Sequence, residues 1–137
     1  MNAIERGVSI LSIISAILVF SACARQEPVS HFVISPGAGN AEISDADADQ
    51  LKDALDRVAA QCHMKKWKSG QVGIIRYYQP TQDYEVGFFA KRLPEALKVY
   101  AEPMTPSVSG TDGFRAFRQN LANVLSQVFP GRVSLEK

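Results

Sequence analysis

Alternating strand patterns in the middle of this sequence constrain its fold more than any other feature. Three segments with a two-residue hydrophobic period follow one another at 72–78, 84–92 and 97–102. They are rich in β-branched and aromatic residues, which favours strands over helices. The segment between the first two, 79–83, contains a proline and predicts a turn. Short connections between consecutive strands predict an antiparallel meander.

A helix-like pattern precedes these strands. Ser44 can cap a helix whose first turn holds acidic residues. Apolar residues then recur at intervals of three and four, at Leu51, Leu55, Val58, Ala59 and Cys62. This spacing predicts one apolar stripe along an amphipathic helix. We expect the helix to continue into the basic residues 65–68 and the region to end at Gly70.

A second helix is predicted after the strands, capped by Thr111 or Asp112 and stopped by Pro130. Its apolar positions are Phe114, Phe117, Leu121, Val124, Leu125 and Val128. Further short strands are expected at 31–34 and 132–136. The predicted fold class is therefore α+β, with an antiparallel meander of three to four strands packed on two helices. In this fold Cys62 packs against Phe117 and Leu121 of the second helix.

The first 22 residues have the layout of an export signal. Arg6 precedes an uncharged apolar run from 8 to 20, which is too short to span a hydrocarbon core of about 30 Å as a helix. Ser21 and Ala22 then lead into Cys23. Here the chain resembles bacterial lipoproteins, whose lipobox ends in two small residues and the cysteine that is lipidated. Phe20 departs from that pattern, in which leucine is usual.

The resemblance implies three regions: a signal peptide at 1–22, a tether at 23–43 that can hold one short strand, and a small α+β domain at 44–137. It also implies that acyl chains such as palmitate on Cys23 anchor the domain to a membrane of the bacterial cell envelope, in the periplasm or outside. The alternative is ordinary cleavage after Ala24, because Ala22, Cys23 and Ala24 also fit the A-x-A pattern. That cleavage would give a soluble exported protein.

Charge and composition argue against several classes of function. The sequence has 15 Lys+Arg and 14 Asp+Glu, a net charge of +1, which is too balanced for a protein that mainly neutralises nucleic-acid phosphates. It contains no nucleophile elbow, phosphate-binding glycine loop or H-E-x-x-H motif. We therefore expect no catalytic residues, no cofactor and no nucleic-acid partner.

Two residue groups could be mistaken for metal sites. Asp45, Asp47, Asp49 and Asp56 have calcium-loop spacing. However, Gln50 replaces the glycine that such a loop requires, and the helix dipole explains acidic residues at this place. Cys62, His63 and Met64 could suit copper, but adjacent helical residues point about 100° apart. We expect no metal site.

Two sets of residues are candidates for partner contact. The first is the basic cluster Lys65, Lys66, Trp67 and Lys68, which could meet an envelope protein or an anionic glycan or lipid. The second comprises Tyr77, Phe89 and Tyr100, which fall on the strand positions opposite the predicted core residues. Either these rings form a contact surface, or the tether and terminal strands cover them.

The sequence thus predicts a membrane-tethered lipoprotein that acts as a non-catalytic binding or accessory factor for another envelope component. The alternative is a small exported enzyme or a ligand-binding module with a pocket beside the sheet.

Overall fold

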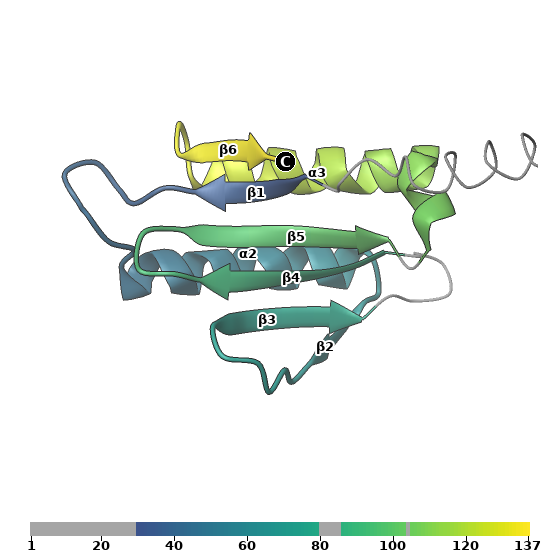
Figure 1. Ribbon diagram of the computed structural model, residues 1–137, viewed down its shortest axis with the longest axis horizontal. Helices are drawn as coiled ribbons and strands as arrows, with labels where there is room; N and C mark the ends of the chain where they lie inside the picture. The colour runs from purple at the N-terminus through teal and green to yellow at the C-terminus, as the bar shows by residue number, and fades with distance from the viewer. Residues whose placement is uncertain (1–29, 80–85, 104) are drawn as a thin grey trace, which may run out of the picture.

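The computed structural model describes residues 30–79, 86–103 and 105–137. The elements are β1 (His31–Ile34), α2 (Asp45–Gln61), β2 (Lys65–Trp67), β3 (Ile74–Gln79), β4 (Val86–Arg92), β5 (Leu97–Pro103), the 3₁₀ helix η1 (Pro106–Gly110), α3 (Asp112–Val128) and β6 (Val133–Glu136) (Figure 1). The predicted signal peptide and Cys23 lie outside the described residues.

All six strands form one antiparallel sheet in the order β2-β3-β4-β5-β1-β6, and α2 and α3 pack on the same side of it (Figure 1). The α+β class is confirmed, but the expected count of three to four strands is wrong. The terminal strands β1 and β6 pair with each other beside β5, so they widen the sheet instead of covering its helix-free face; the tether residues before Ser30 lie outside the described part of the chain. The unexpected sixth strand is β2.

The first helix ends earlier than the basic cluster led us to expect. Ser44 caps its start by accepting a hydrogen bond from the backbone N–H of Asp47 at 3.1 Å. The helix ends at Gln61, and His63 adopts a left-handed conformation with φ of 55° that turns the chain. Residues 65–67 then pair with β3 as an edge strand. The prediction of a basic helix end was wrong because strand pairing, a non-local interaction, decides this segment.

A β-bulge alters the alternation predicted for the third strand. Ile74 pairs with Lys91 and Arg76 pairs with Ala90, so one extra residue lies between them. Arg76 therefore points to the helix side, whereas Ile74 points to the helix-free side. Val72, expected on the strand, lies before it and is fully exposed.

The hydrophobic core lies between the sheet and the two helices. Thr111 caps α3 by accepting a hydrogen bond from the backbone N–H of Phe114 at 3.2 Å. Cys62 is buried in one cluster with Phe117 and Leu121, as predicted. The largest fully buried side chains are Tyr78, Phe88, Phe129, Ile34, Leu51, Leu55, Leu97, Leu121 and Leu125.

Candidate interaction surface

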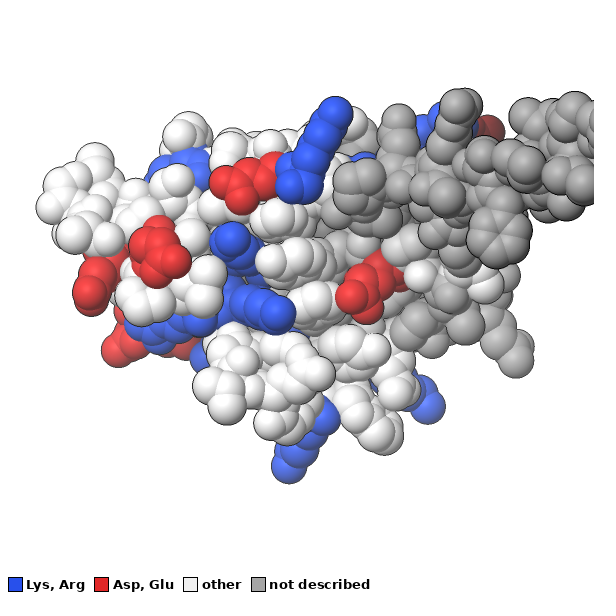
Figure 2. Space-filling model, in the orientation of Figure 1, with Lys and Arg blue, Asp and Glu red and all other residues white. Residues whose placement is uncertain are grey.

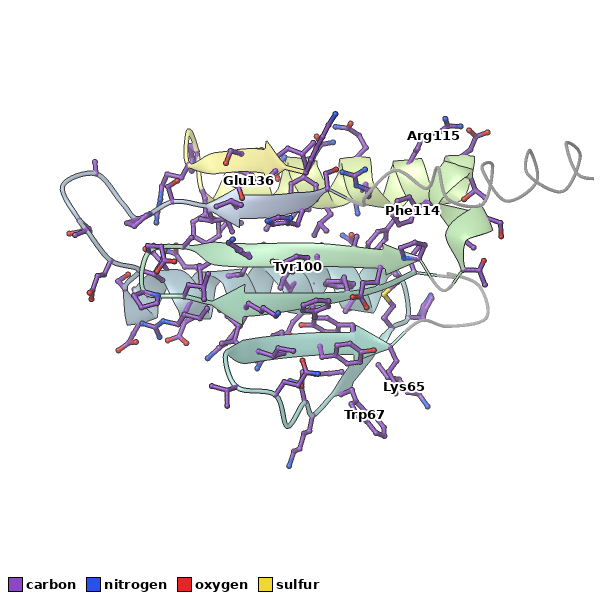
Figure 3. All side chains as sticks on the ribbon, in the orientation of Figure 1. Lys65, Trp67, Tyr100, Phe114, Arg115 and Glu136 are labelled. Carbon is purple, nitrogen blue, oxygen red and sulfur yellow. The ribbon has the colours of Figure 1, made fainter. Side chains whose placement is uncertain are left out.

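A row of mostly aromatic side chains crosses the helix-free side of the sheet. Strand register places Trp67 opposite Tyr77, Tyr77 opposite Phe89, and Phe89 opposite Tyr100. His31 of β1 continues the row by stacking on Tyr100, and Glu136 of β6 lies opposite His31. Figure 3 shows three of these positions, Trp67, Tyr100 and Glu136, in line across the strands. We call this side of the sheet the aromatic face.

The rings of this row stack on one another. The centroids of Phe89 and Tyr100 are 4.8 Å apart with planes 10° from parallel, and those of Tyr100 and His31 are 4.6 Å apart. Tyr77 contacts Phe89 in a tilted arrangement at 6.3 Å. Both faces of Tyr100 are therefore covered by neighbouring rings, whereas Trp67 at the edge of the row is 57% exposed.

Charged side chains flank the row unevenly. Lys91 lies over the rings of Phe89 and Tyr100, at 5.7 and 5.6 Å from their centroids. Lys98 pairs with Lys91 across β4 and β5, whereas Glu102 lies on the opposite side of the row. Figure 2 shows this asymmetry, with positive groups on one side of an uncharged central strip and a negative group on the other.

The basic cluster forms the adjoining edge of the sheet. Lys65, Lys66 and Trp67 make up β2, and all three are exposed, with Trp67 at 57%. Lys68 is also mostly accessible in the segment after the strand. A hollow of about 500 Å³ lies beside them, and Trp67, Tyr77, Phe89 and Glu102 contribute to its walls. The structure thus joins the two predicted sets at Trp67, with Lys65 and Lys68 nearby, whereas Lys66 lies opposite Tyr78 on the helix side of the sheet.

The groups with shifted pKa values lie elsewhere, among buried or half-buried side chains next to α2. Asp56 accepts hydrogen bonds from Tyr78 and from Arg76 Nε, the latter at 3.2 Å. Burial raises the pKa of Asp56, but these hydrogen bonds and the Arg76 charge outweigh it and lower the pKa overall. Burial and the bond to Asp56 raise the pKa of Tyr78. The cluster connects α2 to β3 through satisfied partners, as a structural network does.

A second buried ion pair connects the two ends of the fold. Asp47, at the start of α2, accepts hydrogen bonds from both terminal nitrogens of Arg132, at 3.1 and 2.8 Å. Arg132 also donates from Nε to the backbone oxygen of Ser35 at 2.9 Å. The Arg132 hydrogen bond lowers the pKa of Asp47 and outweighs the opposing effect of burial. No local pattern predicts this pairing, because Asp47 and Arg132 are 85 positions apart in the chain.

The four aspartates with calcium-loop spacing lie on or at the start of α2. Asp45 pairs with Arg92, Asp49 with Lys52, and Asp47 and Asp56 with the arginines above. Within residues 30–79, 86–103 and 105–137, no group of three or more His, Cys, Asp or Glu side chains could hold a metal ion. Within the same ranges, no helix is long and apolar enough to cross a bilayer.

Sequence reasoning missed two parts of the aromatic face. Trp67 belongs to the row, although its sequence neighbours suggested a helix end, and His31 belongs to it through β1. The short apolar run at 31–34 predicted a strand that includes His31, but the place of this strand in the sheet required the strand order. Comparison of the chain with protein families, with curated proteins and with solved structures finds no match.

Proposed function

We propose that this chain is a bacterial envelope lipoprotein that acts as a non-catalytic binding or accessory factor. Lipid on Cys23 holds it at the membrane, and the aromatic face with strand β2 contacts its partner. The observation that supports this best is the row from Trp67 to Tyr100, half-buried or exposed on a sheet face that no described element covers. Aromatic rings and lysine stems provide apolar contact area with polar ends, which suits a protein contact.

The length of the tether restricts where the partner can be. Ser30 precedes β1, and β1 lies inside the sheet between β5 and β6. Six residues lie between Cys23 and Ser30, so the seven steps from one to the other span at most about 25 Å. A domain anchored through Cys23 therefore stays close to the membrane surface, and its partner is a membrane-proximal component of the envelope.

Intact-mass analysis of the protein purified from membranes tests the anchor. We expect a mature chain that begins at Cys23 and carries the added mass of acyl chains. Cys23→Ala should abolish the added mass and release the protein from the membrane fraction. A mature wild-type chain that begins at Arg25 without lipid would contradict the anchor and support ordinary signal cleavage.

A double substitution tests the contact surface. Tyr77→Ala with Phe89→Ala should abolish chemical cross-linking to the envelope partner, because it removes the centre of the aromatic face. The free energy of unfolding should fall by only about 1–2 kcal/mol, because the substitutions remove ring contacts. The matched control is Gln119→Ala with Asn123→Ala on the exposed side of α3, which should keep the cross-link. Loss of folding in the double variant, or an unchanged cross-link, would contradict a contact role.

The hollow beside Trp67 favours a second candidate, a ligand-binding module. At about 500 Å³ it is large enough for a small molecule, and its walls combine rings with the Glu102 carboxylate. This candidate uses the same surface, so the double substitution would remove both activities. A small-molecule ligand would bind without forming a protein cross-link.

A further inference from the structure

The aromatic face has a charge pattern that fits a second copy of itself. We propose that this face forms a homodimer, with a two-fold axis lying in the interface along the aromatic row and across the strands. The proposal rests on the proposed function, since it uses the same contact surface, and it names the occupant of the face. Lys66 of β2 lies on the helix side of the sheet, opposite Tyr78, so it stays outside this interface and accessible to a further envelope component.

Strand β5 lies at the centre of the proposed interface. Its helix-free side presents Lys98, Tyr100 and Glu102 in sequence, because their neighbours Val99 and Ala101 are buried in the core. A two-fold axis through Tyr100 and across the strand exchanges the two ends of this triplet. Each Lys98 then faces Glu102 of the other copy, and the pairing occurs twice, as an isologous interface requires.

Strand β4 extends the same complementarity. Its helix-free side presents Lys91 next to Lys98, and Gly87 next to Glu102. The axis that exchanges Lys98 and Glu102 also places Lys91 over Gly87 of the other copy. From that position the Lys91 ammonium group lies beside Glu102 of the other copy, because Glu102 pairs with Gly87 across β4 and β5.

Within the described part of the chain, the charges of this face form no ion pairs, and Lys91 contacts the rings of Phe89 and Tyr100 instead. Lys91 and Lys98 lie directly opposite each other on paired strands, an arrangement that like-charge repulsion disfavours. Among the described residues, neither lysine has a carboxylate within ion-pair distance, and Glu102 has no cationic partner. In the dimer, Lys91 and Lys98 of each copy lie close to Glu102 of the other copy. This carboxylate reduces the repulsion between the two lysines and gains cationic partners.

The size of the face agrees with a modest dimer. The six strands are three to seven residues long and about 4.8 Å apart, so they cover roughly 500 Å² per copy, or about 1,000 Å² in total. This area is near the lower limit for specific protein interfaces. Anchoring both copies to one membrane would raise their effective concentration and favour association.

Charge reversal on the full-length protein in detergent micelles, followed by sedimentation, tests the proposal. The wild type should sediment as a dimer. Lys98→Glu alone and Glu102→Lys alone should each weaken self-association at least tenfold, whereas the double variant Lys98→Glu with Glu102→Lys should recover it. Recovery distinguishes direct pairing from misfolding, because a misfolded single variant would not be rescued by a second reversal.

Cysteine cross-linking supplies an independent measurement. Tyr100→Cys lies on the proposed axis and should form a disulfide with its own copy under mild oxidation, whereas Gln119→Cys on α3 should not. The wild type controls for the native cysteines. A monomeric wild type, or absence of rescue by the double reversal, would overturn the dimer. If the partner cross-link still depends on Tyr77 and Phe89 in that case, the proposed function stands without the dimer; if it does not, both proposals fail.

Discussion

Replacing Phe88 with alanine should lower the free energy of unfolding by about 3–5 kcal/mol. Phe88 is fully buried at the centre of the core, where its ring stacks on Tyr78 at 4.4 Å and contacts Phe117 of α3 at 5.5 Å. Removing it leaves a cavity between the sheet and both helices. Urea denaturation of the variant and the wild type measures the difference.

The adjacent Phe89 provides a matched control for this substitution. Phe89 points to the aromatic face, so Phe89→Ala should cost less than about 1.5 kcal/mol, mainly through lost ring contacts. Measurements at low protein concentration separate this cost from any effect on dimerisation. Equal losses at the two positions would mean that the assignment of core and open faces is wrong.

Replacing Asp47 with alanine should cost about 2–3 kcal/mol at neutral pH. Asp47 is 12% exposed, and its loss leaves the Arg132 guanidinium, 22% exposed, without its carboxylate partner. The change also removes the ion pair that holds the start of α2 to the segment between α3 and β6. Asp45→Ala is the matched control, since its pair with Arg92 lies at the surface with Asp45 91% exposed, and should cost less than about 1 kcal/mol.

The effect of Asp47→Ala should depend on pH. Because the Arg132 hydrogen bond holds the pKa of Asp47 below the value of about 3.9 for an unfolded chain, its stabilisation is complete above about pH 5. The stabilisation is lost as pH falls through the lowered pKa of the folded state. The gap between wild type and variant should therefore narrow in acid. A gap that stays constant from pH 7 to pH 2 would show that the charge of Asp47 is not its source.

Both helices were predictable because their determinants are local. The apolar spacing from Leu51 to Val58 and the cap at Ser44 depend on neighbours within one or two turns. The same holds for Thr111 and the stripe of α3. In strands, the alternation predicted at 84–92 and 97–102 correctly assigned Phe88 to the core and Phe89 and Tyr100 to the opposite side. These assignments also identified the centre of the aromatic face.

Segments with weak local preferences could not be assigned from the sequence. The local sequence is as compatible with a basic helix end as with a strand at Lys65, Lys66 and Trp67. Pairing with β3 makes this segment a strand. The bulge at Ile74 likewise depends on how β3 meets β4. Short edge strands and bulges are decided by partners distant in sequence, whose contribution exceeds the small local propensities.

By itself, the sequence determined the α+β class, the two capped helices and the alternation that separates the core from the aromatic face, because each follows from a periodicity of two or 3.6 residues. Only the tertiary structure decided that β1 lies between β5 and β6, that Arg132 meets Asp47, and that Trp67 and His31 extend the aromatic row. These features join residues from separate parts of the chain. They depend on strand order and register, which are determined by the packing of the whole sheet against one core.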